Sequence, residues 1–311
     1  MDKWQPSTLS WSFSRKIHFD SCRRHYFYHR FWGQDPSLKW RLFEMRNLTT
    51  LAMLRGQVVH TVIARALEAI RLDQTVDIET ARQSVTDEIR ARYMESQQRL
   101  WHVDNRPPDR KQSQITSLLE HYYGFPDTAD RAREARRIAW LSLENLIGSE
   151  FWASIASSSP SRWVEIEQDG FPCFDLDGIR VYARIDFAHS DDAPTIVDWK
   201  TGSPGPDDRK QLALYCLYAQ ARWGWQPLET RLQAVYLQPE LCVETFTPTA
   251  ADIESIKDEV RTSFAQMLEL EPAFGPADIA NFPPTEDTSQ CAWCRFQGAC
   301  GAARAAEEEP A

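Results

Sequence analysis

Four cysteines at opposite ends of the chain place the strongest constraint on its fold. Cys22 lies near the start, whereas Cys291, Cys294 and Cys300 follow one another closely near the end. Four thiolates satisfy a structural zinc ion or a [4Fe–4S] cluster, and such a site would join the two ends of the protein and restrict the unfolded chain. A Cys-x-x-Cys pair alone also occurs in zinc knuckles and redox pairs, so the spacing leaves zinc and the cluster both open.

The composition is that of a globular chain with a substantial core. Of its 311 residues 42% are hydrophobic and 26% are charged. The longest apolar runs fall short of the ~20 residues that a membrane-spanning helix needs. The N-terminus has no apolar segment typical of a signal peptide, and seven cysteines, an odd number, argue against a disulfide framework. We therefore expect a cytoplasmic protein with no membrane partner.

The net charge and the remaining cysteines are less informative. A formal net charge of −10 does not indicate tight binding to nucleic acid, although local basic patches decide phosphate contact more than the total does. Cys173, Cys216 and Cys242 stand alone in apolar surroundings. We expect them to be small buried hydrophobic residues.

The first half of the chain reads as helical. Apolar residues recur at helical spacing in the second half of the stretch 38–72, which we predict to be one long helix. The region 77–155 reads as several helices, interrupted at a Pro-Pro pair (Pro107 and Pro108). We interpret residues 77–160 as a helical insert and place no site residue in it.

The periodicity changes to that of strands near residue 163. Segments 163–167 and 179–187 alternate as paired strands joined by a turn at 175–178. Strands then alternate with helices, an order typical of an α/β core. The further predicted elements are a strand at 195–200, a helix at 207–223, strands at 231–238 and 242–247, and a helix at 249–270.

Two aspartates and a lysine mark the ends of neighbouring predicted strands. Asp186 ends one strand, and Asp198 and Lys200 share a face of the next, because side chains alternate along a strand. Two carboxylates that face each other repel, so a divalent cation such as Mg²⁺ or Mn²⁺ is their natural partner. Such a cation would bind a scissile phosphate, and Lys200 would orient or polarise the attacking water. An isolated Asp-x-Lys is nevertheless common in exposed turns.

Three other residues strengthen this interpretation. His60 follows Gly56 on the predicted helix and would supply a nitrogen ligand that favours manganese. Gln211 and Tyr215 lie one turn apart on the helix after Lys200, so they can reach the same group together. A glutamate of the first strand, Glu165 or Glu167, is a further candidate, although both are expected to face solvent.

These residues together resemble the PD-(D/E)XK nuclease superfamily, in its RecB-like branch with a four-cysteine iron–sulfur cluster, which includes CRISPR adaptation nucleases and the AddB nuclease domain. The resemblance spans the whole chain except 77–155, and each motif alone is weak. Asp198 stands where many relatives carry glutamate. The motifs in family order are Cys22, Gly56-x-x-x-His60, Asp186, Asp198-x-Lys200, Gln211-x-x-x-Tyr215 and Cys291-x-x-Cys294-x5-Cys300.

The resemblance implies metal-dependent hydrolysis of DNA. It assigns His60, Asp186 and Asp198 to a Mg or Mn ion and Lys200 to catalysis, with Gln211 and Tyr215 supporting the substrate. It assigns the four motif cysteines to a [4Fe–4S] cluster. The substrate would be single-stranded DNA or DNA ends, in repair, recombination, CRISPR adaptation or phage defence, with a helicase or integrase as a candidate protein partner.

The resemblance also implies a fold: a restriction-endonuclease-like mixed sheet flanked by helices, with a helical insert and a terminal metal-cluster staple. An alternative function is a catalytically silent iron–sulfur or zinc module that binds DNA or a protein within a larger complex. The expected division of the chain is an N-terminal helical part (1–76), the helical insert (77–160), the nuclease core (161–275), the cysteine segment (276–303) and a disordered tail (304–311).

Overall fold

The computed structural model describes residues 7–111, 114–167 and 170–301, so the predicted disordered tail at 304–311 lies outside the described residues. The chain forms two compact units, each assembled from segments distant in sequence. Unit 1 comprises Met1–Thr50, Tyr93–Pro126 and Arg261–Ala311, and unit 2 comprises Leu51–Arg92 and Asp127–Val260. Two of the four boundaries fall inside helices, α5 (Ile78–Gln97) and α10 (Ala250–Glu269).

A mixed sheet organises the described part of unit 2. Its strands follow the order β10-β9-β8-β7-β4, in which only β8 and β9 run parallel. A parallel pair needs a crossover, and the helix α9 (Asp208–Trp223) provides it. The α/β fold with a mixed sheet is therefore confirmed. The strands are β4 (Trp163–Ile166), β7 (Phe187–His189), β8 (Thr195–Lys200), β9 (Arg231–Tyr236) and β10 (Cys242–Phe246).

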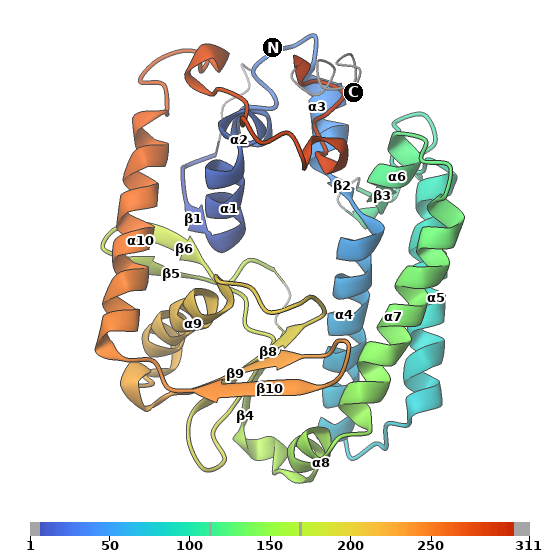
Figure 1. Cartoon of the computed structure of the whole chain (residues 1–311), viewed down its shortest axis with the longest axis vertical. Coiled ribbons are helices and arrows are strands. Elements are labelled where there is room, and N and C mark those ends of the chain that lie inside the picture. The colour runs from blue at the N-terminus through green and yellow to red at the C-terminus, as the bar shows by residue number, and fades with distance from the viewer. Residues whose placement is uncertain (1–6, 112–113, 168–169, 302–311) are drawn as a thin grey trace. The chain divides into compact units, whose positions relative to one another are not determined.

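The central strand β8 is buried along almost its whole length. Ile196 and Val197 are fully buried, and Lys200 at the strand end is the one partly exposed residue. A run of β-branched and aromatic side chains is typical of a strand covered on both faces. The helix α9 packs against β8 and β9, and α4 (Leu51–Arg71) runs beside α7 (Thr128–Ile147) and contacts β4 (Figure 1).

A hairpin lies in the chain between the sheet strands β4 and β7. Asp177 and Gly178, the two residues between β5 (Cys173–Leu176) and β6 (Ile179–Tyr182), both have positive φ angles, of 53° and 82°. An Asp-Gly pair in this conformation is the preferred tight hairpin turn. The short elements of unit 2 are α8 (Glu150–Ser157), η2 (Pro160–Arg162) and η3 (Pro227–Glu229).

Two predicted elements prove to be broken. The strand predicted at 179–187 is two strands, because the chain leaves the hairpin at Ala183, whose N–H bonds the Pro172 carbonyl, and enters the sheet at Phe187. The helix predicted at 38–72 ends near Asn47, and α4 begins at Leu51. The strand β2 (Leu48–Thr49) lies between the two helices and pairs with β3 (Ser117–Leu118), so a tertiary contact overrides the helical periodicity.

Aromatic packing joins the two chain ends in unit 1. Phe282 is fully buried, with its ring centroid 5.1 Å from that of Phe27 and 5.7 Å from that of Phe31, and its carbonyl accepts a bond from Arg24 Nε. Burying one such side chain contributes about 2 kcal/mol. The elements of unit 1 are β1 (Trp11–Ser12), α1 (Phe13–Ser21), α2 (Arg23–Arg30), α3 (Lys39–Arg46), β2, β3, α6 (Leu119–Tyr122), η4 (Ile279–Asn281) and η5 (Cys291–Trp293).

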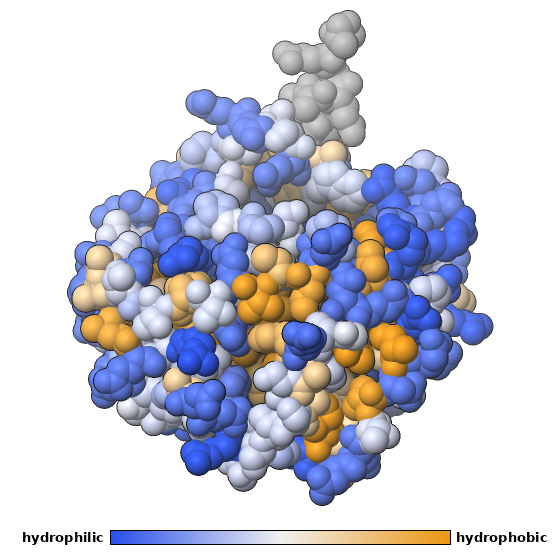
Figure 2. Space-filling model, turned by 60° about the horizontal axis from the view of Figure 1, so that its bottom comes forward, coloured by the Kyte–Doolittle hydropathy of each residue, from blue (hydrophilic) through white to orange (hydrophobic). Residues whose placement is uncertain are grey.

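Apolar and hydrophilic residues alternate on the face drawn in Figure 2, where the apolar residues (orange) form patches separated by hydrophilic residues (blue). No helix among the described residues is long and apolar enough to cross a membrane.

Three half-buried histidines of α1 and α2 stack on one another in unit 1. The ring centroid of His18 lies 4.4 Å from that of His25 and 5.8 Å from that of His29. Burial, reinforced by nearby cations such as Arg295, lowers the pKa of His18 to about 4, of His25 to about 3 and of His29 to about 2. All three are therefore neutral in the folded protein near pH 7.

These histidines should make the stability of the protein fall in acid. Their folded pKa values lie below the ordinary value near 6.5, so the unfolded chain takes up protons first as the pH falls. Each histidine then contributes up to about 1.4 kcal/mol of lost stability per pH unit below that value. We expect His25→Phe, which keeps the ring beside Phe296 and removes a buried Nε2 without a hydrogen-bond partner, to flatten this dependence.

Urea unfolding at pH 7.5, 6.0 and 5.0 measures the effect. Wild type should lose more unfolding free energy than His25→Phe between pH 6.0 and 5.0. Equal losses in the two proteins would show that His25 is protonated as readily when folded as when unfolded.

Candidate active site

Two buried aspartates meet where β8 passes the start of β7. Asp198 lies in the middle of the sheet, and Asp186 directly precedes β7. The backbone N–H of Trp199 donates to Asp186 Oδ2 at 2.8 Å, which fixes this carboxylate beside β8. Asp186 is only 7% exposed and Asp198 only 4% exposed, so their charges repel in a place that water hardly reaches.

This repulsion shows in the protonation of Asp198. Burial, together with the charge of Asp186, raises the pKa of Asp198 to about 6, although Lys200 opposes the shift. Lys200 Nζ lies 2.7 Å from Asp198 Oδ2, yet among the described residues Oδ2 accepts no well-directed hydrogen bond. A buried carboxylate oxygen with lone pairs to spare is a natural contact for a cation.

Lys200 is held by three groups at the end of β8. Besides Asp198, its ammonium donates to Gln211 Oε1 at 2.6 Å and lies 3.4 Å from Asp208 Oδ1. Burial by itself lowers the pKa of Lys200, but the charge of Asp198 and the neighbouring carboxylates outweigh burial and raise it. The lysine therefore stays protonated and cannot act as a base near neutral pH.

Gln211 extends the network along α9. Its Nε2 donates to the hydroxyl of Tyr215 at 2.8 Å, as expected for residues one helical turn apart. Burial raises the pKa of Tyr215 well above its ordinary value, so the phenol stays neutral. The amide of Gln211 thus bridges Lys200 and Tyr215 and restrains both.

The helix α4 brings His60 to the same place. His60 Nδ1 lies 3.1 Å from Asp186 Oδ1. Burial lowers the pKa of His60, but the charges of Asp186 and Asp198 outweigh burial and raise it to about 9. Hydrogen bonds and ion pairs therefore link the six predicted site residues of unit 2 in one network: His60, Asp186, Asp198, Lys200, Gln211 and Tyr215.

The structure adds a residue that the sequence analysis missed. Asp208 Oδ2 accepts bonds from the Gly205 N–H at 2.7 Å and from the Tyr236 hydroxyl at 2.9 Å, while its Oδ1 faces Lys200. Its signal in the sequence was an acidic residue at the start of the helix that follows Asp198-x-Lys200. An acidic residue is favourable in the first turn of any helix, because its charge interacts well with the helix dipole. The contact of Asp208 with Lys200 could therefore not be foreseen from the sequence.

The two glutamates of the first strand differ, and the expectation that both face solvent is wrong. Glu165 is 5% exposed, and burial raises its pKa to about 7, opposed by Arg222 and Arg71. The side chain of Glu167 is 14% exposed and lies near enough to His60 to contribute to its raised pKa. Glu167, just beyond the end of β4, lies beside Asp186, because its backbone N–H donates to the Asp186 carbonyl at 2.8 Å.

The donor set fits a divalent cation, although the side chains do not form a closed metal site as they stand. Across the described ranges, no group of three or more histidine, cysteine, aspartate or glutamate side chains is placed to hold a metal ion. Two repelling carboxylates, one of them with an Oδ2 that accepts no well-directed hydrogen bond, are nevertheless the oxygen donors that Mg²⁺ or Mn²⁺ prefers, and the imidazole adds a nitrogen donor that suits Mn²⁺. In the structure the ammonium of Lys200 provides the neutralising charge.

The four predicted cluster cysteines gather in unit 1. Burial raises the pKa of Cys294 to about 11, and the charges of Cys22, Cys300 and Cys291 add to the shift. Cys291 is affected in the same way, first by burial and then by Cys300 and Cys22. The distant Cys22 thus lies close enough to the C-terminal cysteines to interact with them electrostatically.

The other cysteines depart in part from expectation. Cys216 is fully buried in α9, as predicted, and burial raises its pKa to about 12. Cys173 and Cys242 are exposed, so their interpretation as buried hydrophobic residues is wrong. Each begins a strand, where its side chain faces outward.

The chain belongs to the PD-(D/E)XK nuclease superfamily, whose family profile matches residues 10–301. Two solved structures are similar to it. A proposed exonuclease from Eubacterium rectale has 12% sequence identity, with 96% of this chain and 88% of that chain covered and a TM-score of 0.43. A protein designated SSO0001 has 17% identity, with 59% of this chain and 78% of that chain covered and a TM-score of 0.30. Comparison with curated proteins found no match.

A close backbone approach explains the glycine of the Gly-x-x-x-His motif. A Cβ atom at Gly56 would lie 3.2 Å from Thr201 Oγ1, in the loop after β8. Gly56 thus allows α4 to approach the end of β8, one turn before His60. This contact is a constraint on packing that helical periodicity alone does not reveal.

The contact predicts a non-additive effect of two substitutions. Replacing a mid-helix glycine by alanine normally stabilises a helix by up to about 1 kcal/mol. We expect Gly56→Ala to gain less than this in the wild type, because its methyl group meets the Thr201 hydroxyl. In a Thr201→Ala background, where that hydroxyl is absent, the gain should be recovered in urea unfolding. Equal gains in both backgrounds would contradict the close approach.

Proposed function

We propose that this chain is a Mg²⁺- or Mn²⁺-dependent deoxyribonuclease that hydrolyses phosphodiester bonds in single-stranded DNA or at DNA ends. Membership of a nuclease superfamily supports the general activity. The observation that carries the assignment to these residues is the position of Lys200, whose ammonium lies 2.7 Å from Asp198 Oδ2 and 2.6 Å from Gln211 Oε1. Two buried carboxylates can hold a divalent cation, and the protonated lysine beside them adds a positive charge that can face the phosphate.

His60, Asp186 and Asp198 would hold the cation. When bound, the cation neutralises phosphate charge and lowers the pKa of a water molecule. His60 must lose its proton to serve as a nitrogen ligand. The positive charge of the divalent cation beside Asp186 would favour the loss of that proton. Both carboxylates then exchange their mutual repulsion for attraction to the metal.

Lys200 would stabilise the negative charge that develops on the phosphate. Its ammonium is already oriented by Asp198, Asp208 and Gln211, so little reorganisation is needed as the charge grows. Gln211 and Tyr215 would fix the lysine and position the substrate from the same helix face. The residues of the site would thus bind the cation, orient the substrate and neutralise the developing charge on the phosphate. Water would be the attacking group.

Cleavage of labelled single-stranded DNA in Mn²⁺ tests this proposal. Lys200→Ala should lower kcat by about 10²–10³, the usual effect of removing one preorganised electrostatic contact. Asp198→Asn should lose metal-dependent activity, since a neutral amide holds a divalent cation poorly.

The matched control is Lys210→Ala, which removes a half-exposed lysine of the same helix α9 that pairs with Glu259. It should cleave as wild type does. Unchanged cleavage by both Lys200→Ala and Asp198→Asn would show that the active site lies elsewhere.

We also propose that the chain belongs to the iron–sulfur, RecB-like branch, with Cys22, Cys291, Cys294 and Cys300 holding a [4Fe–4S] cluster. The pKa values of Cys291 and Cys294 are raised by burial and by the neighbouring cysteines, and binding of iron as thiolates would remove this cost. The cluster would act as a staple between distant parts of unit 1. Repair, recombination, CRISPR adaptation and phage defence are the fitting pathways, with a helicase or integrase as a candidate partner.

Loss of a cluster ligand should lower stability before it affects chemistry. We expect Cys22→Ala, purified without oxygen, to lose its visible absorption and its iron, about four atoms per chain, and to unfold at a lower temperature. Cys242→Ser, which changes an exposed thiol, should retain both properties. A colourless wild type that contains zinc, or a Cys22→Ala variant that keeps its iron and its stability, would contradict the cluster.

A further inference from the structure

A pocket of about 910 Å³ lies beside the candidate active site in unit 2. It begins at His60 and follows one face of α4, where Thr61, Ala64, Glu68 and Leu72 recur at helical spacing. Its volume is at the upper end of the ~300–1,000 Å³ typical of ligand pockets. A pocket that includes a candidate metal ligand and extends for several helical turns suits an elongated ligand.

Three arginines determine the chemistry of the pocket. Arg65, Arg92 and Arg184 line it, together with the carboxylates of Glu68 and Glu167. No phenylalanine, tyrosine or tryptophan is among the described residues that line it, so it has no large aromatic platform on which bases would stack. Arginines without aromatic platforms favour contacts with phosphate groups, which carry no sequence information.

The arginines are only partly neutralised. Arg65 and Arg92 both pair with Glu88, at 2.7 Å and 3.2 Å, so one carboxylate serves two cations. The side chain of Arg65 remains 59% exposed. A second anion can therefore bind beside Glu88 without first displacing it.

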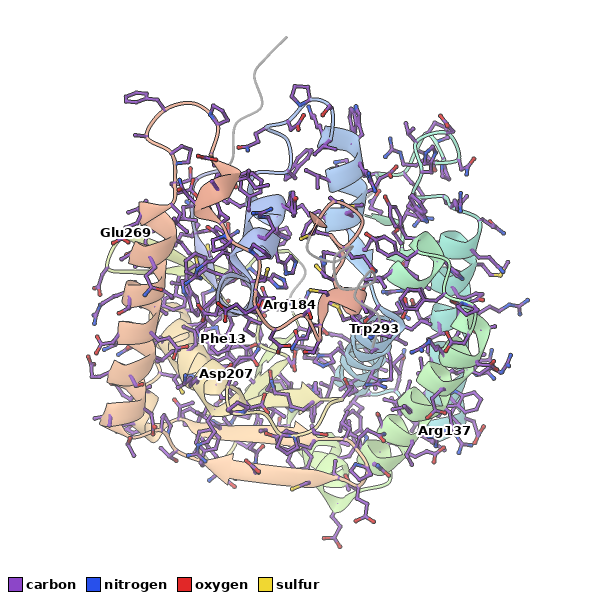
Figure 3. The ribbon with its side chains drawn as sticks, turned by 45° about the horizontal axis from the view of Figure 1, so that its top comes forward. Phe13, Arg137, Arg184, Asp207, Glu269 and Trp293 are labelled. Atoms are coloured by element: carbon purple, nitrogen blue, oxygen red, sulfur yellow. The ribbon has the colours of Figure 1, made fainter. Side chains whose placement is uncertain are left out.

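Arg184 stands nearest to the aspartates. It lies two residues before Asp186, in the segment between β6 and β7, and is labelled in Figure 3. Its guanidinium pairs with Glu167 at 3.0 Å, yet its side chain is 54% exposed whereas that of Glu167 is 14% exposed. Glu167 thus holds an otherwise accessible cation at the edge of the pocket, next to the candidate cleavage site.

We propose that this pocket binds a few nucleotides of single-stranded DNA next to the scissile phosphate, and that Arg184 is a positioning residue for one of their phosphates. The inference rests on the proposed nuclease function and deepens it. A volume of this size has room for part of one strand. Arg65 and Arg92 bind phosphates further along α4, and Glu167 keeps Arg184 in place until DNA competes for it.

The salt dependence of DNA binding tests the inference. Binding of a fluorescent single-stranded oligonucleotide to the full chain in EDTA is measured by anisotropy between 50 and 200 mM NaCl. Each phosphate contact contributes about 0.7 to the slope of log K against log salt concentration for single strands. We expect Arg184→Gln to bind more weakly, with a slope shallower by about 0.7, and Arg65→Gln/Arg92→Gln to lose up to about twice that.

Two further variants separate a phosphate contact from a structural role. Glu167→Gln releases Arg184 and should bind DNA more tightly than wild type, which is opposite in sign to Arg184→Gln. Arg137→Gln is the control, because Arg137 is an exposed arginine of α7 that pairs with Glu134 and lies away from Arg184 (Figure 3). It should leave the affinity and the slope unchanged.

Cleavage kinetics keep this inference distinct from the proposed function. In Mn²⁺, Arg184→Gln should raise KM for single-stranded DNA more than it lowers kcat. If wild type cleaves DNA but Arg184→Gln has the affinity and slope of Arg137→Gln, the pocket assignment is wrong and the nuclease assignment stands. If the slope changes as expected in a protein that cleaves no DNA, the strand site is supported and the nuclease assignment fails. Equally tight binding of a blunt duplex, with the same loss in Arg184→Gln, would overturn the single-strand assignment.

Discussion

The repulsion between Asp186 and Asp198 is the interaction on which the candidate site depends. Two carboxylates less than a tenth exposed are costly to bury, and the cost appears in the pKa of Asp198, raised to about 6. The structure offsets it with the ammonium of Lys200, the imidazole of His60 and the N–H of Trp199. Lys200 and Trp199 belong to β8, His60 comes from α4, and Gln211 of α9 holds the lysine, so the sheet, α4 and α9 must all be in place before the site exists. A divalent cation would supply the same compensation more completely.

The architecture of unit 2 follows from that requirement. The parallel pair β8 and β9 needs the crossover helix α9, and this helix carries Gln211 to the lysine at the end of β8. The approach of α4 to the end of β8, which Gly56 permits, brings His60 to Asp186. Unit 1 instead brings distant parts of the chain together, because Phe282 and the C-terminal cysteines lie near the helices that flank Cys22. Its aromatic packing holds sequence-distant segments together, and the proposed cluster would do the same.

Much of the site was predictable because its residues recur at fixed local spacings. Asp198 and Lys200 alternate along a strand, and Gln211 and Tyr215 are one helical turn apart, so local geometry alone places each pair on one face. Other features depend on distant contacts and were missed. Asp208 resembles any acidic residue at a helix start, Glu165 resembles any exposed strand glutamate, and Asn47 interrupts a helical pattern only because β2 pairs with β3.

The order of residue types along the chain was enough to establish the superfamily motifs, the α/β class and the pairs of side chains that share one face of an element. The strand and helix patterns have periods of two or about four residues, and each motif spans only a few residues. A short stretch of sequence is therefore enough to recognise them. Tertiary structure decided which pairs meet, which of two glutamates adjoins the aspartates, and where the arginines line a pocket. Those outcomes depend on contacts between residues more than a hundred positions apart, such as His60 with Asp186, and packing rather than local spacing determines them.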